Sequence, residues 1–194
     1  SGGSDAGPPL APSGGFFKFR VSMRKVLLLV FLMQTFCLSA RNNLSNRYVM
    51  YPRADDLLYF VLPFDLPCMA KGKAVNLDIT YITSDTQCKV NMSLWTSEPL
   101  RVDSVVFLAG RSYRTDSLTL FFVEKDKGYW WQRLSFKVDY DTLARLYGAE
   151  TPYRLSVYAE GKVLQYAFPA RKWASEYRWM SDLLRLIAYN KERL

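Results

Sequence analysis

The twenty residues VNLDITYITSDTQCKVNMSL, from Val75 to Leu94, decide the fold of this chain. Apolar side chains alternate with polar ones on both sides of the polar segment 83–87: Val75, Leu77, Ile79 and Tyr81 before it, and Cys88, Val90, Met92 and Leu94 after it. A period of two places all the apolar side chains on one face of a strand. The stretch therefore predicts a hairpin from a half-buried antiparallel sheet.

The same pattern continues on both sides of this hairpin. Further strands are predicted at 57–62, 102–108, 118–123, 129–138, 153–159 and 163–168. Gly161 supplies the positive φ that a tight turn between the last two strands requires. Short strands at this spacing predict a mainly β (α+β) fold, an antiparallel β-sandwich or open barrel of about eight strands.

Two helices are predicted. Asp141 is expected to cap a short helix over 141–147, which Gly148 ends. After Pro169, large apolar residues recur at spacings of four, three, four and three: Trp173, Tyr177, Met180, Leu184 and Ile187. This stripe predicts a C-terminal amphipathic helix over 171–190 that packs on the sheet. Because Trp179 and Leu183 widen the stripe, an alternative is a detachable helix that docks into a partner's groove.

Residues 23–40, MRKVLLLVFLMQTFCLSA, have the order of a secretory signal peptide. The basic pair Arg24 and Lys25 precedes an apolar run, and small residues end at Ala40, where cleavage is expected. A retained N-terminal anchor is one alternative, although the run is shorter than a typical span. A lipoprotein acylated at Cys37 is another, although Phe36 fits poorly before such a cysteine. The expected location is periplasmic or extracellular, in a bacterial envelope.

The other segments differ in composition. Residues 1–22 are rich in Gly, Pro and Ser, which indicates a disordered or non-native upstream extension. Residues 41–56 are expected to form a polar lead-in arm, and 57–194 a single β-rich domain. The whole chain has 26 basic and 18 acidic residues, of which four basic and one acidic lie in 1–40. The remaining part therefore has 22 basic and 17 acidic residues, a net charge of +5. Without a Lys/Arg run, this charge argues against nucleic-acid binding.

The residue types present exclude several chemistries. The chain contains no histidine, so Ser-His-Asp and Cys-His nucleophile systems and the usual zinc sites are excluded. It has no Gly-rich phosphate loop and no EF-hand loop, and neither cofactor nor metal is expected. The pairs Asp55-Asp56 and Asp139-Asp141 leave a carboxylate-based, glycan-acting enzyme as an alternative. An arm in solvent and a helix cap are simpler interpretations of these pairs.

The candidate binding residues are Tyr129, Trp131, Arg133 and Lys137. They share one face of the predicted strand 129–138, whose other face is apolar. Aromatic rings among cations are typical of surfaces that stack on sugars or anchor a protein partner. The alternative is that the terminal helix covers this face with Trp173, Tyr177 and Met180.

Cys68 and Cys88 form a candidate disulfide, since an exported chain meets an oxidising compartment. The alternative is two reduced thiols. Together these patterns predict an exported, non-catalytic envelope protein, a module that binds an envelope protein or a glycan. Contact with the membrane is expected only during export, unless the leader is retained. A structural envelope component without a small ligand remains a further alternative. No pattern indicates an oligomeric state.

Overall fold

The computed structural model describes residues 46–193. The expected extension 1–22, the signal peptide 23–40 and the first residues of the arm lie outside this range. The described chain forms two antiparallel sheets, of six and four strands, and two helices. The predicted mainly β, sandwich-like fold is confirmed.

The larger sheet is built around the predicted central hairpin. Its strand order is β1 (Tyr48–Pro52), β2 (Leu57–Leu66), β3 (Val75–Ile82), β4 (Gln87–Thr96), β8 (Tyr129–Asp139) and β7 (Thr119–Asp126). Along the hairpin, the register runs from Asn76 opposite Ser93 to Thr80 opposite Lys89. The alternating apolar residues of β3 and β4 are buried on the inner face, as the period of two requires.

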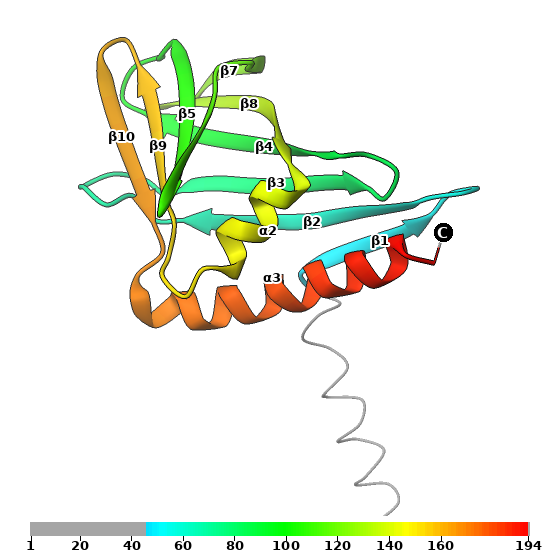
Figure 1. Ribbon diagram of the computed structural model, residues 1–194. Helices are drawn as coiled ribbons and strands as arrows, with labels where there is room; N and C mark the ends of the chain where they lie inside the picture. The colour runs from blue at the N-terminus through cyan, green and yellow to red at the C-terminus, as the bar shows by residue number, and fades with distance from the viewer. Residues whose placement is uncertain (1–45, 194) are drawn as a thin grey trace, which may run out of the picture. The chain divides into compact units, whose positions relative to one another are not determined.

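The smaller sheet has the order β10 (Lys162–Ala167), β9 (Arg154–Ala159), β5 (Val102–Ala109) and β6 (Arg111–Thr115). Figure 1 shows β10, β9 and β5 crossing the strands of the larger sheet. Glu160 and Gly161 join β9 to β10 with φ values of 49° and 76°, as in a type I′ turn. The inner faces meet in a common core, in which Phe107 of β5 lies 6.1 Å, between ring centroids, from Phe136 of β8.

The terminal helix α3 (Ala170–Lys191) covers part of the inner face, beside β1 and β2 (Figure 1). Its most buried residues are Trp173, Trp179, Met180, Leu183 and Ile187. Trp179 and Leu183 therefore belong to the buried stripe, whereas Tyr177 and Leu184 lie at its flank, half-buried. The wide apolar face is used inside the domain, and the helix packs on the sheet as predicted. No helix within residues 46–193 is long and apolar enough to cross a membrane.

Three details differ from the sequence-based expectation. Residues 46–193 contain ten strands rather than about eight, because β1 and β6 are edge strands with little apolar alternation. The arm 41–56 thus contains a strand, which pairs with β2. The short helix α2 (Tyr140–Gly148) begins before Asp141, and Asp139 precedes it without a capping side-chain bond. Asp141 instead lies in the first turn, where a carboxylate favours the helix dipole.

Candidate ligand-binding site

The outer face of β8 carries all four predicted binding residues, and α3 does not cover them. A cavity of about 20 Å³ on the opposite face is lined jointly by Ile79 and Tyr81 of β3 and by Leu183 of α3. The helix therefore lies against the inner face of the sheet. The alternative in which Trp173, Tyr177 and Met180 cover the outer face is wrong, because Trp173 and Met180 belong to the core and Tyr177 packs against it.

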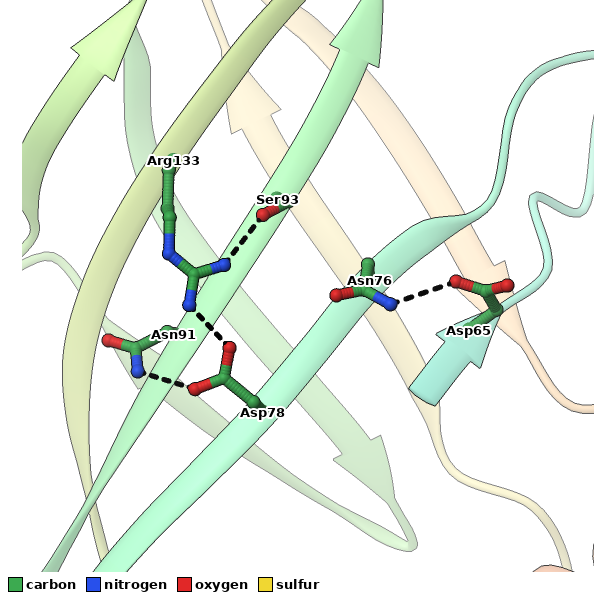
Figure 2. A network of polar contacts seen from close by, with 6 residues as sticks. All are labelled: Asp65, Asn76, Asp78, Asn91, Ser93 and Arg133. Carbon is green, nitrogen blue, oxygen red and sulfur yellow. Dashed lines mark hydrogen bonds and ion pairs between the residues drawn. The ribbon is translucent and has the colours of Figure 1, made fainter. Parts of the chain in front are cut away.

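Arg133 is held in a polar network on this outer face (Figure 2). Its Nη2 lies 2.5 Å from Oδ2 of Asp78, which is fully buried. Its Nη1 donates to Oγ of Ser93 at 2.9 Å, and Nδ2 of Asn91 donates to the second oxygen of Asp78 at 2.6 Å. The guanidinium neutralises a buried carboxylate, so Arg133 stabilises the sheet and is not free to bind a ligand.

Trp131 lies in an aromatic cluster beside this network. Its ring is parallel to that of Trp95, with centroids 6.2 Å apart, and meets Phe122 edge-on at 4.6 Å. The indole Nε1 is buried and has no hydrogen-bond partner within the described chain. Because the rings of Trp95 and Trp131 face each other and Phe122 packs against Trp131, this pair does not offer two open faces to a sugar.

Lys137 lies far from the other candidates. It is opposite Lys89 in the register of β4 and β8, eight residues along β8 from Tyr129. At about 3.3 Å per residue, the two backbone positions are about 26 Å apart. The four predicted residues consequently do not form one site.

Tyr129 does border a site. It lies on the rim of a groove of about 810 Å³, which is lined by segments 68–73, 95–98 and 162–166 together with Leu100 and Tyr129. The ammonium of Lys73 lies 3.8 Å from the centroid of the Tyr129 ring. These segments come from the loop after β2, the end of β4, the start of β8 and the edge strand β10.

Apolar and cationic groups meet in this groove. Met69, Tyr129 and Val163 are three large apolar side chains with 52%, 40% and 46% of their surface exposed. Lys71 and Lys73 are exposed and form no ion pair within residues 46–193, whereas Lys162 pairs with Glu98. The groove thus has exposed apolar side chains and a net positive charge, which suits a ligand with apolar and anionic groups.

The sequence pattern did not indicate most of the groove. Its loop residues Met69 and Lys73 belong to no periodic segment, and Val163 had the ordinary appearance of a strand residue. Trp95 was the one residue whose pattern pointed to the groove. It follows Ser93 on the polar face of the strand, where a large aromatic side chain is unexpected. Gly72 allows the loop to pass close to Cys68, since a Cβ there would lie 3.2 Å from Sγ of Cys68.

The predicted disulfide is not formed, and both cysteines are free. Cys68 lies two residues after Leu66, the last residue of β2, which is opposite Val75 at the start of β3. It forms an isolated bridge with Tyr166. Cys88 precedes Lys89, which is opposite Thr80, and Thr80 lies five positions after Val75 along β3. Val75 and Thr80, which mark the places of the two cysteines along β3, are about 16 Å apart. A disulfide requires Cα atoms within about 7 Å.

The two carboxylate pairs lie outside the groove. Asp56 accepts hydrogen bonds from the hydroxyl of Thr83 and from the backbone amide and hydroxyl of Ser84. These bonds link the turn before β2 to the turn after β3. Asp139 accepts a bond from the amide of Gln87 at 3.1 Å. Within the described residues, no group of three or more acidic or cysteine side chains is placed to hold a metal ion.

Comparison with known proteins found no matching family model, no matching curated protein and no matching solved structure.

Proposed function

We propose that this protein is an exported, non-catalytic binding module of the cell envelope, and that its ligand occupies the groove beside Tyr129. The observation that carries the proposal is the exposure of Met69, Tyr129 and Val163 on one groove, together with Lys71 and Lys73, which form no ion pair in the described part of the chain. The order of charges and apolar residues in 23–40 supports export.

The groove has a size suited to a ligand. Its volume of about 810 Å³ falls within the range of about 300–1,000 Å³ typical of ligand sites. Complete burial of one large apolar side chain contributes about 1.5–3 kcal/mol. Because three such side chains are only partly exposed here, covering them contributes a few kcal/mol to binding, before the entropy of association is subtracted.

The absence of catalysis is proposed from the groups that line the groove. Among residues 46–193, Glu98 is the one carboxylate that lines the groove, and it is engaged with the ammonium of Lys162. General acid and base catalysis on a glycoside requires two carboxyl groups around the scissile bond. One carboxylate in an ion pair does not supply them.

The test uses the full chain and two defined arrays, one of envelope glycans and one of synthetic peptides. Tyr129→Ser and Lys73→Ser are each compared with Tyr158→Ser. Tyr158 has a similar exposure, 38%, but lies on β9 outside the groove. We expect both groove variants to weaken binding about tenfold or more, with the control unchanged. Ligands whose affinity is insensitive to both groove variants, or arrays without any ligand, would overturn the proposal.

A further inference from the structure

The free edge of β10 is the most distinctive feature of the groove. Among the strands of residues 46–193, β10 pairs with β9 alone, so part of its other edge is available. In a hairpin with a two-residue turn, the flanking residues Ala159 and Lys162 exchange backbone hydrogen bonds. The backbone groups of alternate residues from Val163 onward consequently point away from β9.

Two hydrogen bonds establish this orientation independently. The amide of Met69 donates to the carbonyl of Gln165 at 2.8 Å, and the amide of Ala167 donates to the carbonyl of Pro67 at 3.1 Å. Gln165 and Ala167 therefore present their backbone groups to the outer edge. Val163 belongs to the same alternating set.

The chain itself already adds a short strand to this edge. Cys68 forms an antiparallel bridge with Tyr166, and the loop then leaves the edge after Met69. Within residues 46–193, the backbone amide and carbonyl of Val163 have no backbone partner. The groove runs along residues 162–166, so it includes Val163, where the loop leaves the edge open, as well as Gln165 and Tyr166, where the loop is paired. In Figure 1 this loop, in teal between β2 and β3, lies beside β10.

We propose that the groove binds an extended acidic peptide, which adds to β10 as an antiparallel strand in continuation of segment 67–69. This inference rests on the proposed binding function and specifies the ligand. Main-chain hydrogen bonds to Val163 provide affinity, and alternate side chains of the peptide provide specificity. Met69 and Val163 contact apolar side chains of the peptide, and Lys71 and Lys73 attract its carboxylates.

Two observations favour a peptide over a glycan. An open strand edge with paired donor and acceptor is complementary to another main chain, and a sugar reproduces this pattern poorly. In addition, the ammonium of Lys73 lies over one face of the Tyr129 ring, and the rings of Trp95 and Trp131 face each other. These arrangements reduce the ring surface on which a sugar would stack.

The experiment measures binding of the acetylated peptide EVEVEVEV to the full chain by calorimetry. Two further peptides carry N-methyl groups on all the valines or on all the glutamates. Because an added strand directs alternate amides to its neighbour, we expect one methylated peptide to lose about tenfold or more in affinity and the other to keep it. The peptide KVKVKVKV controls for charge and is expected to bind much more weakly. Amide hydrogen exchange at Val163 should slow when EVEVEVEV is bound.

A protein variant tests the same contact from the other side. Val163→Pro removes the outward amide, which a free strand edge tolerates, and Val163→Thr keeps it as the matched control. We expect Val163→Pro to abolish peptide binding and Val163→Thr to retain it. If Val163→Pro strongly lowers the melting temperature of the protein, the comparison of the two methylated peptides tests strand addition without this variant.

Each outcome separates the inference from the function on which it rests. Equal binding of both methylated peptides, or binding without protection of the Val163 amide, overturns strand addition but leaves the groove as the site. A glycan ligand whose binding depends on Tyr129, with no peptide binding, also overturns strand addition alone. Failure of both glycans and peptides to bind overturns both proposals.

Discussion

Replacing Arg133 with methionine should destabilise the protein strongly, because it isolates a buried charge. Asp78 is fully buried and would keep only its bond from Asn91. Removing one partner of a buried ion pair typically costs about 3–5 kcal/mol. Because the Arg133 side chain is 26% exposed, water can reach part of the vacated space, and we expect a loss near 3 kcal/mol. That is a large share of a typical net stability of about 5–15 kcal/mol.

A second substitution distinguishes charge isolation from loss of packing. In the double variant Arg133→Met with Asp78→Leu, no carboxylate remains buried, although Asn91 loses its acceptor at a cost of about 1–3 kcal/mol. We expect the double variant to be more stable than Arg133→Met alone. Arg185→Met is the control, because Arg185 is 80% exposed and its nitrogen lies 3.7 Å from Asp182. An exposed pair of this kind is worth less than about 1 kcal/mol.

Urea denaturation of the parent and the three variants measures these differences, and an unchanged slope m ensures that the free energies are comparable. If Arg133→Met costs no more than Arg185→Met, Asp78 is not an isolated charge in that variant. If the double variant is no more stable than Arg133→Met alone, packing rather than charge explains the loss. Either result would refute the reasoning.

Further predictions concern the helix, the thiols, alkaline pH and export. Deleting residues 171–194 should abolish cooperative thermal unfolding, because it exposes the core under α3; a truncated chain that melts near the parent temperature contradicts this. Burial raises the pKa of the Cys88 thiol to about 12, so a maleimide at pH 8 should label half-buried Cys68 and leave Cys88 unlabelled until the chain unfolds. Burial likewise raises the pKa of Tyr81 to about 12. Between about pH 8.5 and 12 these two groups are protonated in the folded state and ionised in the unfolded state, so the urea midpoint of unfolding should fall as the pH rises through this range. A urea midpoint that stays constant would contradict this prediction. N-terminal sequencing of the protein outside the cytoplasm should begin near Arg41, and a chain retaining residues 23–40 in the soluble cytoplasm would contradict export.

The extent of sequence-based prediction differed between the elements. The central hairpin and α3 were predictable because their apolar residues repeat with the period of the structure that they form. The range 171–190 matches α3 closely, yet the centre of its buried stripe was misplaced towards Tyr177 and Leu184. A helix surface that is apolar over a wide arc does not indicate which part meets the core.

Local periodicity therefore determined the class of fold and the placement of most strands, because side-chain alternation depends only on neighbouring residues. It did not determine which strands are neighbours. Asp78 and Arg133 are 55 positions apart and meet only because β8 pairs with β4, beside β3. The pairing of β3 with β2 on one side and with β4 on the other separates Cys68 from Cys88. The groove likewise joins a loop, two strand ends and an edge strand from distant parts of the sequence, because only tertiary packing decides which backbone groups and side chains remain uncovered.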